Sequence, residues 1–331
     1  MAKLKVFRLH FRTPLHIGLG RSAYDSSSSD LHSDTISAAL AAIKAQHGAS
    51  SEELRCFLDS FAMSSAFPYE GKMYFLPRPL TADRITVDGS DGAEFRKLLK
   101  SVRYIESSVW KGFVEESIPS ISSTQIHDGY LTPLGYSDFV SPYKEQVMQR
   151  VSVSRSGEDD AAPFFFEWCF FNASKDCGLY IIVDAKDDVL VEVESLLKEL
   201  GETGIGTDKT VGGGQFDVTA DSIDLPTDGG DALLSLSLYI PSEKEQAAID
   251  LKDSCYNLIQ RGGFMAGSSD YTLRHLWKKS IYMYEEGSVF ITDSKLEGII
   301  ADLQPEWNSK VMHPVFRSGK ALFIPVKTVK P

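Results

Sequence analysis

The sequence has few cysteines and no long apolar run. Its four cysteines are scattered without a C-x-x-C pair, which excludes a zinc ribbon and a dithiol redox motif. No stretch approaches the roughly 20 apolar residues that cross a bilayer, and the opening MAKLKVFRLHF is typical of a strand rather than a signal peptide. We therefore expect a cytoplasmic protein with no membrane partner, whose cysteines are small core residues.

Positive charge is also scarce. The net charge of −12 has the wrong sign for a protein that attracts nucleic acid through its overall field. Any such site must be local, with the acidic remainder facing solvent or basic neighbours. The chain has 331 residues, 43% of them hydrophobic and 24% charged, which is ordinary globular composition. That length predicts two domains of roughly 150 residues each.

Residues 1–225 are expected to form the first domain. Polar and apolar residues alternate over the segment from Lys3 to Arg12, which predicts a half-buried strand. A helix ending near Gln46 should follow, capped by Ser33 or Asp34. A buried strand GLYIIV, an amphipathic helix, a glycine loop and a last strand come later. This order predicts a β-α-β-β-α-β unit with an antiparallel sheet, which is an α+β fold.

Residues 226–331 are expected to form a second α+β domain after a Pro/Gly-containing linker. Ala248, Leu251, Cys255 and Leu258 fall at helical spacing and predict a helix there. Before it, an insertion at about 120–165 contains VMQRVSVSRSGEDDAAPFFFEW. Alternating residues on both sides of an acidic turn predict a hairpin that projects from the body.

The glycine-rich loop at residues 201–214, within GETGIGTDKTVGGGQF, is the strongest functional signal. Glycine permits positive φ and close backbone approach, so consecutive amides there could form an anion nest, with Lys209 as a mobile charge for phosphate. A flexible turn without a ligand remains the alternative. A nucleotide P-loop is disfavoured, because Thr207 stands where that motif requires lysine and the loop follows a helix.

Other candidates are individually weaker. His16, with Gly18, Gly20 and Arg21 just after the first strand, could meet phosphate or base, or could be structural. The helix start at Ser33 could bind phosphate or simply be capped. The remaining cations, which could equally be solvated, lie in the hairpin or beside glycines: Arg150, Arg155, Arg261, His313, Arg317 and Lys320.

A ribonuclease is the enzymatic alternative. Asp25, Asp30 and Asp34 lie near His16 and His32 in sequence, so metal-dependent or general acid/base cleavage of RNA stays open. Serine-rich loops with scattered aspartates are usually solvated, however, and no nucleophile elbow or H-E-x-x-H occurs. A pure protein-interaction module is a third possibility. We expect no cofactor and no resident metal.

Several blocks resemble a known family. HIGLG, SDTISAAL and GIGTDKTVGGGQF together resemble the RAMP superfamily of CRISPR proteins. FPYEGKMYFLPRP, SLSLYIPSEKE, RGGF, EEGSVF and HPVFRSGKALFIPV look like the fourth subunit of the Csm complex of type III-A systems. These blocks span nearly the whole chain in the expected order.

The resemblance implies two ferredoxin-like (RRM-like) domains with antiparallel sheets, a glycine-rich loop and a β-hairpin thumb. It implies a non-catalytic subunit of an antiviral effector, which binds the 5′ handle of the crRNA. The implied protein partners are the large polymerase-like signalling subunit and the backbone RAMP subunit. The superfamily also contains guide-processing endoribonucleases with a catalytic aspartate after the first strand, a place that Asp25 or Asp30 could take.

Taken with the residue patterns, the resemblance also implies which residues face RNA. They are His16, Gly18, Gly20, Arg21, Ser33, Arg150, Arg155, Gly204, Gly206, Lys209, Gly212, Gly213, Gly214, Arg261 and Arg317.

Overall fold

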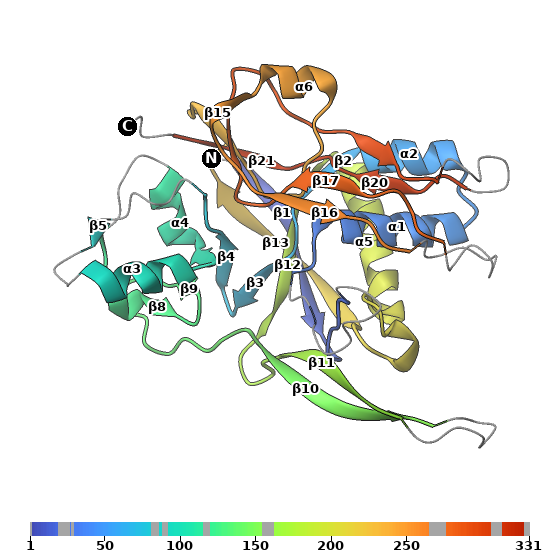
Figure 1. Cartoon of the computed structure of the whole chain (residues 1–331), viewed down its shortest axis with the longest axis horizontal. Helices are drawn as coiled ribbons and strands as arrows, with labels where there is room; N and C mark the ends of the chain where they lie inside the picture. The colour runs from blue at the N-terminus through green and yellow to red at the C-terminus, as the bar shows by residue number, and fades with distance from the viewer. Residues whose placement is uncertain are drawn as a thin grey trace.

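A computed structural model shows a mixed α+β protein with mainly antiparallel sheets (Figure 1). It describes residues 2–18, 27, 30–80, 86–87, 92–114, 120–153, 162–264, 276–305 and 313–327. None of the helices in these ranges is long and apolar enough to cross a bilayer.

The largest sheet has the strand order β13-β1-β12-β3-β4-β6-β9-β8, and β2 also pairs with β12. Neighbouring strands are antiparallel except β6 and β9, which are parallel. The strands are β1 (Ala2–Phe11), β2 (Phe61–Met63), β3 (Phe67–Glu70), β4 (Met73–Pro77), β6 (Tyr104–Glu106), β8 (Ile126–His127), β9 (Tyr130–Leu131), β12 (Cys177–Ala185) and β13 (Phe216–Leu225).

Three helices pack against one face of this sheet: α1 (Ser33–Gln46), α2 (Ser51–Asp59) and α5 (Asp187–Thr203). Side chains on a strand alternate between faces, so Phe7 and Leu9 of β1 join the helix-side core while Val6 joins the other one. The strands and helices predicted for residues 3–46 and 178–218 are therefore present in the predicted order, with β13 and β12 on either side of β1.

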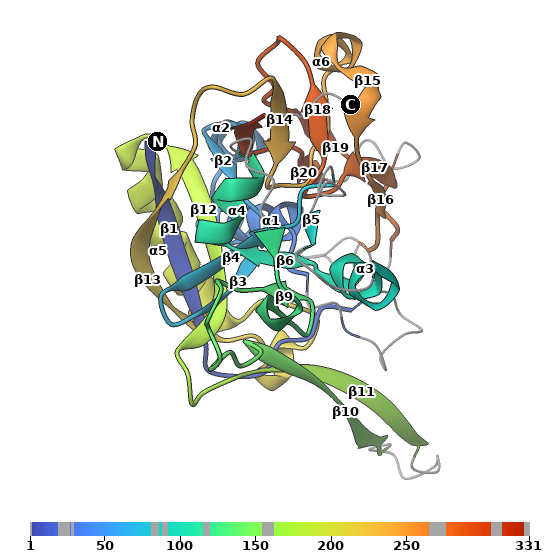
Figure 2. The same cartoon turned by 90° about the vertical axis from the view of Figure 1, so that its left-hand side faces the viewer.

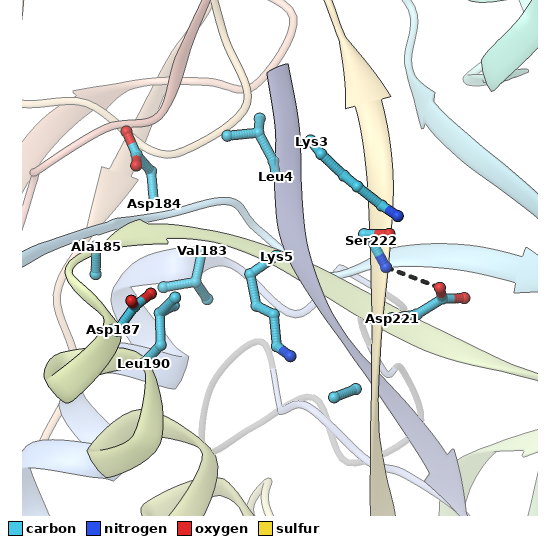
Figure 3. A pocket seen from close by; sticks show the side chains of 11 residues that line it. Lys3, Leu4, Lys5, Val183, Asp184, Ala185, Asp187, Leu190, Asp221 and Ser222 are labelled. Carbon is cyan, nitrogen blue, oxygen red and sulfur yellow. Dashed lines mark hydrogen bonds between the residues drawn. The ribbon is translucent and has the colours of Figure 1, made fainter.

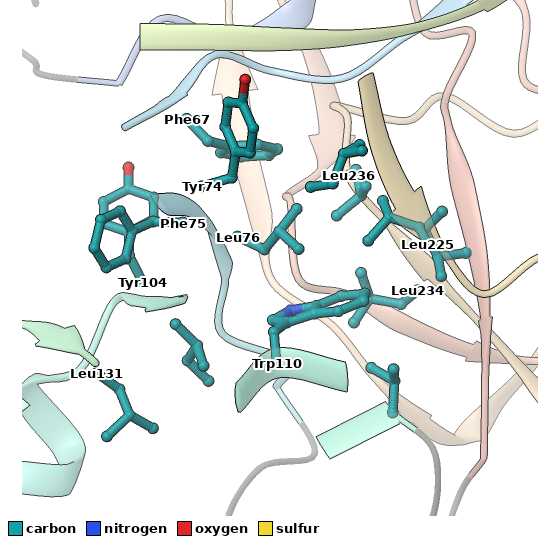
Figure 4. Close-up of a cluster of buried hydrophobic side chains, with 14 of the residues drawn as sticks. Phe67, Tyr74, Phe75, Leu76, Tyr104, Trp110, Leu131, Leu225, Leu234 and Leu236 are labelled. Atoms are coloured by element: carbon teal, nitrogen blue, oxygen red, sulfur yellow. The ribbon is translucent and has the colours of Figure 1, made fainter. Parts of the chain in front are cut away.

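The opposite face carries a second core that joins the two halves of the chain (Figure 4). Trp110 of α4 (Ser107–Val114) is fully buried there, and its indole Nε1 donates to the Pro77 carbonyl at 2.9 Å. Leu234 and Leu236 from the C-terminal half pack in the same cluster. Nearby lie α3 (Gly92–Ser101) and the short parallel pair β5 (Thr86–Val87) and β7 (Ser120–Ile121).

A long hairpin projects from the body (Figure 2). Its strands are β10 (Tyr143–Ser152) and β11 (Ala162–Phe171), paired in continuous register from Tyr143 opposite Phe171 to Ser152 opposite Ala162. The hairpin lies further along the chain than the expected insertion at about 120–165. Residues 120–131 instead form β7, the 3₁₀ turn η2 (Ser123–Gln125) and the strands β8 and β9 at the edge of the main sheet.

The C-terminal half contains a sheet of order β15-β18-β14-β21 and two strand pairs, β16–β17 and β19–β20. Its elements are β14 (Ala232–Ser235), α6 (Glu243–Ala248), β15 (Asp250–Cys255), β16 (Leu258–Arg261), β17 (Ile281–Tyr284), β18 (Val289–Ile291), β19 (Ile300–Asp302), β20 (Phe316–Ser318) and β21 (Phe323–Val326).

The helix predicted through Leu258 is wrong. A capping box formed by Ser242 and Glu245 starts α6, but the helix ends at Ala248. The next residues pair with β18 instead, and the Ile291 amide donates to Ser254 Oγ at 3.0 Å. That partner strand is distant in sequence, so local spacing could not reveal how tertiary pairing overrides helix propensity.

Candidate nucleic-acid interface

The glycine-rich loop connects the end of α5 to β13. Gly204 ends the helix with φ of +80°, and Gly206, Gly212 and Gly214 also have positive φ. A short 3₁₀ turn, η3 (Lys209–Val211), forms the outer part of the loop. Its three residues are exposed, whereas Gly213 and Gly214 are buried.

Close packing explains most of these glycines. A Cβ on Gly206 would lie 2.3 Å from the His16 carbonyl oxygen, and one on Gly214 would lie 1.9 Å from that of Ile205. A Cβ on Gly213 would come within 2.7 Å of the Trp168 ring. The loop is therefore folded against the end of β1 and against the hairpin.

The loop does not present the continuous row of free amides expected from the sequence. Many of its N–H groups donate to carbonyls inside the protein; they belong to Gly204, Ile205, Thr207, Val211, Gly212, Gly213 and Gly214. The glycines thus serve loop folding first, and the exposed cation of the loop is Lys209 in η3. Contact of this loop with RNA stays a prediction.

His16 lies between the loop and the hairpin. Its carbonyl accepts the Thr207 amide at 3.1 Å, and its ring Nδ1 is 2.8 Å from the Glu167 carbonyl. The ring packs on Phe166 at 4.2 Å between centroids and is only 2% exposed. The segment after β1 therefore meets the glycine loop, and the imidazole is buried in the contact.

One face of the hairpin, which carries Arg150, Phe166 and Trp168, completes the cluster. The Arg150 guanidinium donates to Asp208 of the loop at 3.0 Å and lies 4.5 Å from the Phe166 ring and 5.1 Å from the Trp168 ring. Phe166 and Trp168 are themselves buried. Sequence reasoning selected Arg150 but missed Asp208 and both aromatics. Their signal was the alternation in PFFFEW, which places Phe166 and Trp168 on one strand face.

The hairpin also exposes apolar side chains. Val151, Val153 and Phe165 are 55%, 72% and 57% exposed. Recognition of single-stranded RNA combines cations for phosphate with aromatic or apolar surfaces for bases. Lys209 supplies the cation, and the exposed apolar side chains of the hairpin supply the surface for bases, next to one cluster. We use the term loop–hairpin cluster for His16, Arg150, Phe166, Trp168 and Asp208 together with the glycine loop.

Arg261 and Arg317 do not join the loop–hairpin cluster, and their contact with RNA stays a prediction. Both bind Asp34 at the start of α1: Arg261 Nε donates to its carboxylate at 2.9 Å, and Arg317 donates to the same oxygen. Asp34 is fully buried and Arg317 nearly so. Burial would raise the pKa of Asp34, but the charges of Arg317 and Arg261 lower it to about 2.

This pKa predicts an acid-dependent loss of stability. A carboxyl group whose folded pKa is lowered stabilises the fold above its unfolded pKa and loses that contribution as the pH falls. Between pH 5 and pH 3, the protein should lose roughly 1 kcal/mol through Asp34 alone. Urea unfolding of the wild type and the Asp34→Asn variant at both pH values measures this, because the difference between them should shrink by that amount. An unchanged difference would mean that the Asp34 pKa is not lowered.

Ser33 and two carboxylates of the ribonuclease hypothesis, Asp30 and Asp34, are also engaged. His32, and not Ser33 or Asp34, is the N-cap of α1, and the Ser33 amide donates to Ser65 Oγ at 2.8 Å. Asp30 accepts two hydrogen bonds from the Arg103 guanidinium, at 2.8 and 2.7 Å. With Asp34 held by arginines, neither carboxylate is placed as a free base. The described part of the chain contains no group of three or more His, Cys, Asp or Glu side chains that could hold a metal.

The other predicted residues are dispersed. Gly20, Arg21, Asp25 and Arg155 lie outside the described residues. Gly18 packs beside Thr207 of the loop. In the C-terminal half, Lys320 is ion-paired with Asp59 at 3.1 Å, and the exposed His313 is 3.0 Å from the Pro314 carbonyl.

A surface hollow of about 520 Å³ lies near the start of β1, between β13 and the beginning of α5 (Figure 3). Lys3 and Lys5 line it together with Asp184, Asp187 and Asp221. Because the carboxylates offset the two ammonium groups, the hollow offers no net positive charge for a phosphate. It therefore adds nothing to a nucleic-acid site.

Comparison with known proteins finds similarity to one family of CRISPR proteins. The CRISPR Csm4 C-terminal domain family matches residues 228–326. A curated relative, the CRISPR system Cms protein Csm4 of Thermococcus onnurineus (strain NA1), is 24% identical over 266 residues, which is 77% of this chain and 83% of the relative. The chain is a Csm4-like CRISPR protein.

Solved structures share the fold of this Csm4-like chain. A chain of the Csm1-Csm4 cassette in complex with cA4 superimposes with a TM-score of 0.64 at 18% identity, and both chains are covered completely. A chain of the Csm3-Csm4 subcomplex in the type III-A CRISPR-Cas interference complex gives a TM-score of 0.61 at 15% identity, again with complete coverage. The C-terminal match includes Arg261 and Arg317, so the family domain contains both arginines that bind Asp34.

Proposed function

We propose that this Csm4-like chain is a non-catalytic, RNA-binding subunit of a type III-A Csm effector complex that serves antiviral defence in the cytoplasm. It would bind the 5′ handle of the crRNA. The loop–hairpin cluster carries this proposal, since it combines an exposed lysine, a folded glycine loop and a projecting hairpin with exposed apolar side chains. Such a combination suits a single-stranded RNA, whose backbone and bases are both accessible.

The proposal includes two ferredoxin-like (RRM-like) domains, residues 1–225 and 226–331, and the use of the β10–β11 hairpin as a thumb. The strand order β13-β1-β12-β3 with α1 and α5 on one face supports this assignment for the first domain. The family match to residues 228–326 supports a distinct second unit.

The proposed protein partners are the large polymerase-like signalling subunit and the backbone RAMP subunit. Solved structures of Csm1 with Csm4 and of Csm3 with Csm4 support partner subunits of this kind. Mass spectrometry of the proteins and nucleic acid that copurify with the tagged chain tests the assignment. Recovery of neither a guide RNA nor another Csm subunit would argue against it.

Lys209 provides a direct test of RNA binding. Because an ammonium that neutralises a phosphate of a single strand contributes about 0.7 to the slope of log affinity against log salt, Lys209→Gln should reduce that slope by about 0.7. Its affinity for an RNA oligonucleotide carrying the repeat-derived handle should fall about three- to tenfold. Lys244→Gln is the matched control, because Lys244 is exposed on α6, remote from the loop.

Equal slopes for the wild type and Lys209→Gln would remove Lys209 from the interface. Incubation of the wild type with the same RNA, with and without magnesium, tests the ribonuclease alternative. Specific cleavage that is lost on substitution of Asp30 or His16 would replace the non-catalytic proposal with an enzyme.

A further inference from the structure

Arg150 lies near the outer end of the paired hairpin strands, two residues before Ser152. Its guanidinium is engaged on both sides, by the Asp208 carboxylate and by the faces of Phe166 and Trp168. The next residue, Val151, lies on the opposite face of the hairpin and is more than half exposed. The Arg150–Asp208 ion pair thus joins the outer half of β10 to the glycine loop.

We propose that Arg150 is a positioning residue that fixes the angle of the hairpin on the glycine loop and does not itself bind RNA. Arg150 and Phe166 lie on the same face of the hairpin, as neighbours across the two strands, because Met148 is directly opposite Phe166 in the register. The guanidinium can therefore stack on the aromatic pair while its Nη1 reaches out to the loop.

Asp208 is held firmly enough to serve as the anchor. Its carbonyl accepts the amides of Val211 at 3.1 Å and Gly213 at 3.2 Å, so the backbone at this residue is fixed by the turn that it starts. Gly213 in turn has no room for a Cβ beside Trp168. The Arg150–Asp208 ion pair and the close packing of Gly213 on Trp168 therefore both join the glycine loop to the hairpin.

The next residue, Lys209, is the exposed cation of the loop. A phosphate bound there would act on the backbone that carries Asp208, and the ion pair would pass the displacement to the hairpin. This inference rests on the proposed function for the identity of the ligand. The mechanical connection itself can be measured without any RNA.

The test is amide hydrogen exchange of the RNA-free chain. Arg150→Met and Asp208→Asn each remove the ion pair, and the exchange of amides at 147–151 and 164–167 should rise about tenfold in both. The charge-swapped double variant, Arg150→Asp with Asp208→Arg, should recover at least part of the protection. Amides of α1 serve as the internal control and should not change. If the hairpin amides of both single variants exchange at rates within twofold of the wild type, the proposal is overturned.

RNA binding gives a second readout that separates positioning from direct contact. If Arg150 bound phosphate, its loss would reduce the salt slope by about 0.7, and Asp208→Asn would tighten binding by removing a negative charge. A positioning role predicts an unchanged slope in Arg150→Met and weaker binding in Asp208→Asn. Failure of the wild type to bind handle RNA would refute the proposed function. The exchange measurement would still decide whether Arg150 fixes the position of the hairpin on the glycine loop.

Discussion

Asp34→Asn is expected to lower the free energy of unfolding by about 3–5 kcal/mol, because it leaves buried cations without their counter-charge. Arg317 is 6% exposed and Arg261 is 22% exposed, and both donate to Asp34. Lys278 is close enough that burial, with the charge of Arg317, lowers its pKa to about 8. Asparagine keeps the size of the side chain but cannot neutralise these groups. The urea midpoint at neutral pH, with an unchanged slope, measures the loss.

Asp59→Asn is the matched control for that experiment. Asp59 also pairs with a cation, Lys320 at 3.1 Å, but its side chain is 66% exposed, so the change should cost less than about 1 kcal/mol. Adding Arg317→Met to Asp34→Asn should recover part of the stability, because it removes an unpaired buried charge. Equal effects of Asp34→Asn and Asp59→Asn would show that the arginine pair does not hold the two halves together.

Gly206→Ala is expected to reduce the affinity for handle RNA about 100-fold. Position 206 has φ of +107°, and the new Cβ would lie 2.3 Å from the His16 carbonyl oxygen. Real Cβ atoms do not approach backbone this closely, so the loop must move away from the end of β1. That movement breaks the Thr207 amide bond to His16 and displaces Lys209. Filter binding or fluorescence anisotropy at fixed salt measures the effect.

Gly212→Ala is the control that separates the steric clash of a new Cβ from backbone strain. Gly212 also has positive φ, +85°, but a Cβ added there would meet no atom within 4 Å. Strain of roughly 1–2 kcal/mol for a left-handed residue is expected in Gly212→Ala, whereas Gly206→Ala adds a clash with the His16 carbonyl oxygen. Binding within about threefold of wild type is expected for Gly212→Ala. If Gly206→Ala also binds normally, the loop is not part of the RNA site.

Local pattern was sufficient for residues 3–46 and 178–218. Leu9 and Phe11 alternate with Arg8, His10 and Arg12, and Leu196, Leu197 and Leu200 line one face of α5, so strand and helix could be recognised without knowing their partners. The glycine content of the loop also indicated close backbone approach. The sequence could not show which residues the glycines approach, because His16 and Trp168 are distant in sequence from the loop.

The contacts of single charged residues were the least predictable. Arg261 lies beside glycines, which suggested an RNA contact, yet its partner is Asp34, 227 positions away. Asp30 likewise was a candidate base until the fold placed Arg103 against it. The residues next to a charged side chain in sequence do not indicate whether folding will place an opposite charge beside it.

By itself, the sequence determined the α+β class, the main strands and helices of residues 3–46 and 178–218 and the glycine-dense loop, because these depend on periodicity and composition along the chain. It also carried the sequence blocks on which the family resemblance rests. Only the tertiary structure decided that the loop amides are largely used internally, that β15 replaces a helix, and that Arg150 reaches Asp208 while Arg261 and Arg317 reach Asp34. Each of those outcomes depends on which distant segments meet, and hydrogen bonds and ion pairs form only after they do.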